Sequence, residues 1–311
     1  MCCLFGILDY GNSLTVRQKT KTLSILAASC EVRGTDATGI AYNTKSHLTI
    51  YKRPKAAHTM WFRLPDDASV IMGHTRMTTQ GDEKFNYNNH PFYGRVGGTS
   101  FALAHNGMFI NDFDLQMTYR LPKTNIETDS YVAVQMLERQ KDLSFESIAD
   151  VAEKLEGTFT LSMLDESNSV YFVKGDNPLC LYYWRERNLF MYASTEEILK
   201  SALARIPYKF GVHERIEINE GDIMKISSNG EINFSQFSLH NLYSCGWYGS
   251  PYSYYLDDWY RDPPSKNTTY EDLLRSMAHT FGYTAEDVDA LLADGFAPEE
   301  IEDLFYEGAL C

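Results

Sequence analysis

The second residue of the chain brings together two groups that could act in catalysis. The sequence starts Met1-Cys2-Cys3-Leu4, and removal of Met1 would leave Cys2 with both a thiol and an α-amine. A thiol is nucleophilic as the thiolate, and an α-amine, whose pKa is about 7.7–8.0, can accept its proton near neutral pH. The simpler alternative is a small buried apolar side chain near a terminus. Cys2 is therefore a candidate nucleophile that needs partners elsewhere in the chain.

Two later segments contain groups that could bind negative charge. Arg76 follows an apolar run, and an arginine there can hold a carboxylate through paired hydrogen bonds, with a solvated side chain as the alternative. Asn106-Gly107 lies between apolar runs, which is first of all the signal for a tight hairpin turn. The side-chain amide of Asn106 and the backbone N–H of Gly107 could instead donate to the oxyanion of a tetrahedral intermediate.

Two further polar segments have equally simple alternatives. Residues 127–130 (ETDS) precede an apolar helical pattern, so Thr128 or Asp129 is expected to cap the helix. The carboxylate of Asp129 could also hold an ammonium group. Arg33 begins a polar turn that leads into a strand. Each segment is weak by itself, and only their occurrence together favours catalysis.

The elements that must position these residues are expected in blocks. Helices are predicted at 14–31, 128–140 and 145–155. Strands are predicted at 2–10, 38–43, 48–53, 69–74, 100–105, 158–164, 169–174, 179–185, 189–192 and 222–226. Because the strands are grouped around a pair of helices and do not alternate with them, this order favours an α+β layered domain.

The chain changes character after about residue 238. Residues 243–260 are rich in Tyr and Trp and are expected to pack back onto the main domain, with an exposed binding surface as the alternative. Residues 284–308 contain no Lys or Arg and include a short internal repeat with Thr284 at a cap position. Together with the segment before them, these residues are expected to form a small acidic helical module. This module is either a structural cap or, slightly favoured, a docking element.

Composition limits the classes of partner. The net charge of −14 over 311 residues argues against a nucleic-acid-binding surface and against docking on anionic membrane. We find neither a signal-peptide pattern nor an apolar run of the ~20 residues that a membrane span needs. The six cysteines lack CxxC spacing, so we expect reduced thiols in the cytoplasm and no metal site. No cofactor is expected either.

The order of the motifs is more specific than any one of them. Cys2 is followed by RGTDATGIA, GHTRMTTQG, NNHPF, AHNGMFIN and ETDS. This succession resembles the class II glutamine amidotransferases, which are N-terminal-nucleophile (Ntn) amidohydrolases, and in particular the glutaminase domains of glucosamine-6-phosphate synthase and glutamine phosphoribosylpyrophosphate amidotransferase. The resemblance covers residues 2 to about 230. It implies a four-layer αββα Ntn-hydrolase sandwich, here followed by a small helical C-terminal appendage.

The resemblance also implies roles for the matching residues. Cys2 would attack the side-chain amide of glutamine with its own α-amine as base, forming a thioester. Asn106 and Gly107 would form the oxyanion hole. Arg76 would hold the α-carboxylate of the substrate, and Asp129 its α-amine. Three residues would surround these groups: Thr79 and His90 in the loops around the substrate, and Arg33 in the wall near the nucleophile.

The sequence departs from the family pattern at three positions. Cys3 stands where glycine is usual beside the nucleophile, and Gln80 replaces histidine. Met77 replaces a tryptophan that helps to gate the ammonia route in the family. This last change puts channelling in doubt but not amide hydrolysis.

Three functions therefore remain open. The first is a stand-alone glutaminase that delivers ammonia to a separate synthase partner, docked through the tail or the aromatic segment. The second is an amidohydrolase that acts on another γ-glutamyl amide, and the third is a non-catalytic binding module. We expect a glutaminase domain at 2–240, an aromatic linker at 241–265 and an acidic helical tail at 266–311.

Overall fold

The computed structural model describes most of the chain. The described residues are 2–45, 47–242, 271, 274, 275, 278, 283–298, 300, 301 and 304. The chain divides into two compact units, residues 1–243 and 244–311. The aromatic run predicted at 243–260 lies outside the described residues.

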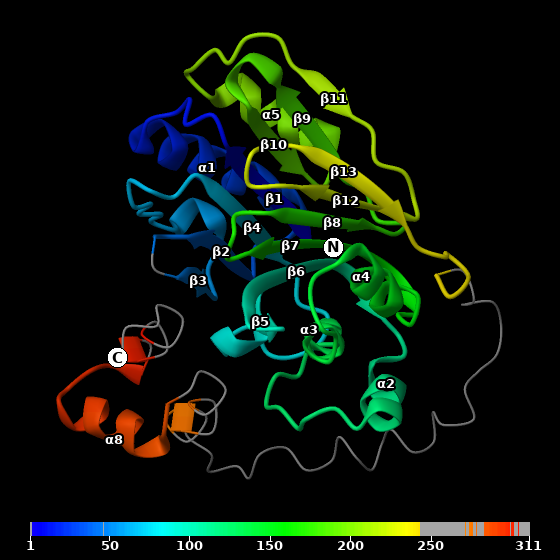
Figure 1. The fold of residues 1–311 in the computed structure, drawn as a ribbon. Helices are drawn as coiled ribbons and strands as arrows, with labels where there is room; N and C mark the ends of the chain where they lie inside the picture. Colours follow the sequence, from blue (N-terminus) through cyan, green and yellow to red (C-terminus); the bar gives the residue numbers. More distant parts are fainter. Residues whose placement is uncertain are drawn as a thin grey trace. The chain divides into compact units, whose positions relative to one another are not determined.

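Two antiparallel sheets form the centre of the first unit (Figure 1). The seven-stranded sheet has the order β11-β9-β10-β1-β4-β2-β3, and the six-stranded sheet has the order β13-β12-β8-β7-β6-β5. The strands of the first sheet are β1 (Cys3–Asp9), β2 (Ala37–Asn43), β3 (Leu48–Arg53), β4 (Val70–Arg76), β9 (Cys180–Trp184), β10 (Leu189–Ala193) and β11 (Glu214–Ile216). Those of the second are β5 (Phe92–Val96), β6 (Thr99–Phe109), β7 (Gly157–Asp165), β8 (Val170–Lys174), β12 (Asp222–Ile226) and β13 (Ile232–Gln236).

Helices cover the outer face of each sheet (Figure 1). Helices α1 (Val16–Cys30) and α5 (Glu196–Arg205) pack together on the first sheet, against β1 and β10. Helices α3 (Tyr131–Glu138) and α4 (Phe145–Ala152) pack on the second sheet, against β5 and β12. Contacts of β1 and β3 with β6 join the two sheets. The result is the predicted α+β sandwich with layers in the order αββα.

The first strand and helix follow from their sequences. Every residue of β1 is buried, as its run of apolar residues predicts. Helix α1 begins after Thr15, whose side chain accepts from the backbone N–H of Gln18 in a capping box. Its buried face includes Leu23, Leu26 and Cys30, which are the residues that the helical spacing selects. This packing fixes the start of the chain, and with it Cys2, to the centre of the sheet.

Two local predictions are wrong. The residue that precedes α3 is Ser130, and no side chain caps the helix, so neither Thr128 nor Asp129 has that role. Asn106 and Gly107 form no hairpin turn; they lie inside β6, opposite Thr160 and Phe159 of β7. In both places the residues that were expected to form a local cap or turn make other contacts in the fold. The sequence reasoning also missed α2 (Asp112–Tyr119) and α5, and the strands β5, β11 and β13.

The described part of the tail contains a small core of its own. Leu274, Ala278, Val288 and Ile301 are buried together. Helix α8 (Ala285–Ala293) begins at Thr284, which forms a capping box with Asp287 and confirms the predicted cap. Among the described residues of both units, no helix combines the length and the apolar character that crossing a membrane requires.

Candidate active site

A small cleft gathers most of the predicted catalytic residues. Strand β1 pairs with β4 so that Cys3 lies opposite Thr75, which places Cys2 opposite Arg76. Six predicted residues line the cleft: Cys2, Arg76, Thr79, His90, Gly107 and Asp129. Two others lie beside it and are not among its lining residues: Arg33 and Asn106. Five separate segments of the sequence thus meet at one point.

Cys2 is half-buried, and its thiol is held by the backbone. Its Sγ lies 3.5 Å from the backbone nitrogen of Met77 and 3.6 Å from the Met77 carbonyl oxygen. Arg33 donates from Nε to the carbonyl oxygen of Cys2 at 2.8 Å, which fixes the peptide behind the thiol. Burial raises the pKa of the Cys2 thiol, although the Met77 backbone and the charge of Arg76 oppose the rise. The thiol therefore needs a base to ionise at neutral pH.

The extra side chain at Cys3 does not enter the cleft. Cys3 is fully buried and packs in the core beneath α1, in the same cluster as Leu26 and Cys30. This departure from the family pattern is absorbed by the core.

Arg76 presents a fixed positive charge. Its side chain is only 3% exposed, and one terminal nitrogen donates to Asn89 Oδ1 at 2.7 Å. The other donates to the carbonyl oxygens of Gln80 and Gly81. A guanidinium has five N–H donors, so two more remain for an anionic group in the cleft. These bonds also tie the loop after β4 to the end of that strand.

Asp129 presents a negative charge in the same cleft. Its Oδ2 accepts from the backbone N–H of Phe109 at 2.6 Å, and Ser130 Oγ lies 3.4 Å from its Oδ1. His105 Nδ1 lies 2.8 Å from Ser130 Oγ and 4.0 Å from Asp129 Oδ2. Burial lowers the pKa of His105, although Asp129 opposes this, so the imidazole is neutral at pH 7. The aspartate charge is left available to a cation in the cleft.

Gly107 has a backbone that only glycine accepts without strain. Its φ is +144°, and a Cβ at this position would lie 1.9 Å from the carbonyl oxygen of Thr158. The neighbouring Asn106 is 1% exposed, and its Nδ2 donates to Ser194 Oγ at 3.4 Å. The strand therefore carries two potential donors, one side-chain amide and one backbone N–H, and Gly107 lines the cleft together with Cys2.

The two remaining lining residues differ in environment. Thr79 is exposed on the loop after β4, whereas His90 is 4% exposed and precedes a cis peptide bond to Pro91. Both ring nitrogens of His90 are buried without a hydrogen-bond partner. Burial, together with the nearby His74 and Arg76, lowers the pKa of His90 well below its usual value. His90 therefore offers a neutral ring to the cleft.

Sequence reasoning missed several residues of the site. His105, Thr128 and Ser130 also line the cleft. Their motifs were recognised, but Thr128 and Ser130 were taken for parts of a helix start. Asp36, in the RGTD turn, accepts from the backbone N–H of Thr78 at 2.7 Å and so steadies the loop after β4. The sequence signal for this role was the aspartate three residues after Arg33.

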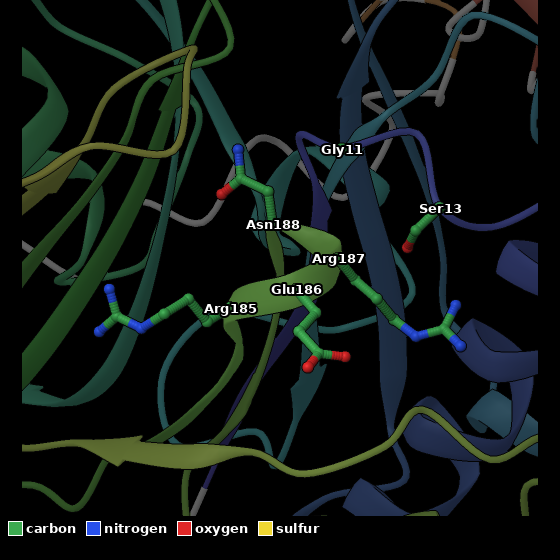
Figure 2. A pocket seen from close by; sticks show the side chains of 6 residues that line it. All are labelled: Gly11, Ser13, Arg185, Glu186, Arg187 and Asn188. Atoms are coloured by element: carbon green, nitrogen blue, oxygen red, sulfur yellow. The ribbon is translucent and has the colours of Figure 1, made fainter.

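Other hollows of the described structure have no comparable chemistry. One of about 490 Å³ is lined by Gly11, Ser13, Arg185, Glu186, Arg187 and Asn188. Figure 2 shows Arg185 and Arg187 pointing to opposite sides, and they bind Glu214 and the carbonyl oxygen of Phe210, respectively. Among the described residues, no group of three or more His, Cys, Asp or Glu side chains is arranged to hold a metal ion.

Comparison with known proteins supports the resemblance that the motifs predict. Residues 74–201, which include Arg76, Gly107 and Asp129, match the family described as a glutamine amidotransferase domain. The chain resembles the class II glutamine amidotransferases, as its motifs predict. Its fold is similar to that of glutamine phosphoribosylpyrophosphate amidotransferase from B. subtilis, with a TM-score of 0.60 and 18% identity over 77% of this chain and 50% of that one.

Curated relatives of the chain are longer proteins. The 7-cyano-7-deazaguanine synthase of Sulfolobus acidocaldarius is 24% identical over 72% of this chain and 51% of its own length. The glutamine–fructose-6-phosphate aminotransferase of Chlamydia muridarum is 30% identical over 65% of this chain and 32% of its own. The chain thus spans about half the length, or less, of these relatives.

Proposed function

We propose that the amidotransferase domain hydrolyses the side-chain amide of glutamine to glutamate and ammonia through a thioester on Cys2. The observation that carries the proposal is the convergence of Cys2, Arg76, Gly107 and Asp129 on one cleft. Arg76 and Asp129 offer opposite charges, which complement the α-carboxylate and α-ammonium groups of a free amino acid. A glutamine held at both groups would extend its amide toward Cys2.

The first half of the reaction makes the thioester. Once Met1 is removed, the α-amine of Cys2 accepts the thiol proton, and the thiolate attacks the carbonyl carbon of the side-chain amide of glutamine. The carbonyl oxygen becomes an oxyanion, which accepts from the Gly107 N–H and from the Asn106 amide. Collapse of this intermediate breaks the C–N bond, and the proton on the α-amine of Cys2 passes to the leaving ammonia.

The second half releases glutamate. Water enters the place that ammonia left and gives a proton to the α-amine of Cys2 as its oxygen attacks the thioester carbon. A second oxyanion forms in the same hole, and its collapse breaks the C–S bond. The proton returns to the sulfur, so that glutamine and water have become glutamate and ammonia and Cys2 is regenerated.

The fate of the ammonia is the second part of the proposal. The longer relatives are named as a synthase and as an aminotransferase that uses glutamine, which supports transfer of the nitrogen to an acceptor site. We propose that this chain passes ammonia to a separate synthase partner in the cytoplasm. In this proposal residues 2–240 form the glutaminase domain, 241–265 a linker, and 266–311 an acidic tail that docks the partner.

A second substrate class is favoured by one observation. Met77 lies beside the Cys2 thiol and is 51% exposed, so the mouth of the cleft is bordered by a flexible and solvent-accessible side chain. An N-substituted γ-glutamyl amide would keep the groups that Arg76 and Asp129 bind and would leave its amine toward this opening. The alternative function is hydrolysis of such an amide.

Glutamate release from purified protein tests these functions together, because both glutamine and a substituted γ-glutamyl amide yield glutamate on hydrolysis. The wild type and Cys2→Ala are incubated with glutamine and with γ-glutamyl amides of increasing size. Hydrolysis of glutamine by the wild type alone supports the proposal, and a much faster reaction with a substituted amide supports the alternative. If neither protein hydrolyses any of them, the domain is a binding module and the proposal is wrong.

A further inference from the structure

A buried serine outside the cleft joins the nucleophile strand to the oxyanion strand. Ser194 follows β10 directly and is fully buried. Its Oγ accepts from the backbone N–H of Leu4 in β1 at 2.9 Å and from Asn106 Nδ2 in β6 at 3.4 Å. Strands β1 and β6 belong to different sheets, so this hydroxyl connects the two sheets at the active site.

The register of the strands explains why a side chain takes this place. Strand β1 pairs with β10 from Asp9–Leu189 to Phe5–Ala193, and the next pair would be Leu4 with Ser194. The ladder ends there, and the Leu4 N–H bonds to the serine side chain. The hydroxyl therefore continues the support of β1 for one more residue, to within two residues of Cys2.

The same hydroxyl restrains the Asn106 side chain. An asparagine amide has two N–H donors, and one of them is occupied by Ser194. This hydrogen bond restricts rotation of the amide group. The second N–H of the amide is then available for an oxyanion. Because a misplacement of about 1 Å in such a donor can reduce the rate ~100-fold, restraint of this group matters for catalysis.

We propose that Ser194 is a positioning residue that aligns the Asn106 amide with the sulfur of Cys2. It touches neither substrate nor reacting atoms, and it acts on the transition state through Asn106. The inference rests on the proposed glutaminase function. It predicts a loss in kcat and little change in KM, because the groups that bind the amino-acid end of glutamine do not depend on this bond.

The test compares Ser194→Ala with two matched variants. In Ser194→Ala we expect kcat for glutamine to fall about 10- to 100-fold and KM to change less than about threefold. Ser194→Thr keeps the hydroxyl and should recover most of the lost rate. Ser162→Ala removes another fully buried serine, on β7, and should leave kcat within about twofold of the wild type.

A second readout separates alignment of Asn106 from general support of β1. Alkylation of Cys2 by iodoacetamide needs the thiolate but forms no oxyanion. In Ser194→Ala its rate should stay within about twofold of the wild type while glutamine hydrolysis falls. If both rates fall together, or if Ser194→Thr is as impaired as Ser194→Ala, the hydroxyl supports only packing and the inference is overturned.

The remaining outcomes separate failure of the inference from failure of the proposed function. An unchanged kcat in folded Ser194→Ala overturns the inference and leaves the proposed function intact. A wild type that hydrolyses no γ-glutamyl amide overturns the proposed function itself, and the inference with it. If Ser194→Ala does not fold, Ser194→Cys replaces it. Its sulfur is larger than the serine oxygen and a weaker acceptor, so kcat should again fall without a change in KM, and an unchanged kcat contradicts the inference.

Discussion

The charge of Asp129 gives the sharpest prediction about substrate recognition. Replacement by asparagine keeps the shape of the side chain and an oxygen that can accept from the Phe109 backbone, a bond of 2.6 Å. It removes the negative charge that faces the cleft, at a site only 4% exposed. We therefore expect Asp129→Asn to fold normally and to lose the attraction for the substrate ammonium group.

The size of the effect follows from the kind of bond. A buried hydrogen bond to a charged group contributes about 1.5–3 kcal/mol. At about 1.4 kcal/mol for each factor of ten, kcat/KM for glutamine should fall roughly 10- to 150-fold. The fall should appear mainly in KM, because the ammonium group is bound equally in the ground state and the transition state.

A matched substrate makes this prediction specific. Glutaramate has the amide and the carboxylate of glutamine but no α-amine. The wild type should prefer glutamine to glutaramate, and Asp129→Asn should lose that preference while hydrolysing glutaramate almost as well as the wild type. Ammonia release measured at several concentrations of each substrate gives both values of kcat/KM. Equal losses for the two substrates would refute the assignment of Asp129 to the α-amine.

Three more predictions concern the other groups of the cleft. Arg76→Lys should raise KM for glutamine about tenfold or more, because lysine cannot reproduce the fork that holds both the loop and a carboxylate; an unchanged KM contradicts this. Gly107→Ala should lower the free energy of unfolding by about 2–4 kcal/mol, measured by urea denaturation, since a Cβ would meet Thr158 O at 1.9 Å; wild-type stability would mean that β6 adapts. A variant with one residue added before Cys2 should react slowly with iodoacetamide at pH 7, and its alkylation rate should rise only at alkaline pH. The reason is that burial raises the pKa of the Cys2 thiol, so that the thiolate forms only above that pKa. Fast alkylation at pH 7 would contradict the need for the α-amine.

Much of the fold could be predicted because its periodic patterns are strong. The apolar run of β1 and the spacing of Leu23, Leu26 and Cys30 in α1 correspond to buried faces in the structure. Strands β11 and β13 were missed because they are mostly exposed edge strands with mixed composition. Helix α5 was missed although Thr195 caps it, since the preceding strand pattern gave no reason to expect a helix there.

The site could be predicted from motif order and not from local rules. By local rules Asn106-Gly107 is a hairpin turn, yet tertiary pairing with β7 keeps it extended. Asp129 looks like a helix cap, yet it accepts from the Phe109 backbone N–H in β6. Ser194 gave no local signal, because its partners Leu4 and Asn106 are distant in sequence and meet only through the sheet register. Local propensity thus fails at the residues that the proposed chemistry uses.

The central claim is that Cys2 is the nucleophile and the first residue of the active protein. Its most direct test is the mass of the N-terminal peptide from active protein, quenched in acid during turnover of glutamine. The account predicts a peptide that begins at Cys2 and carries a glutamyl group on that residue, with neither the adduct nor activity in Cys2→Ala. An active protein whose N-terminal peptide still begins with Met1, or a Cys2→Ala variant as active as the wild type, would contradict it.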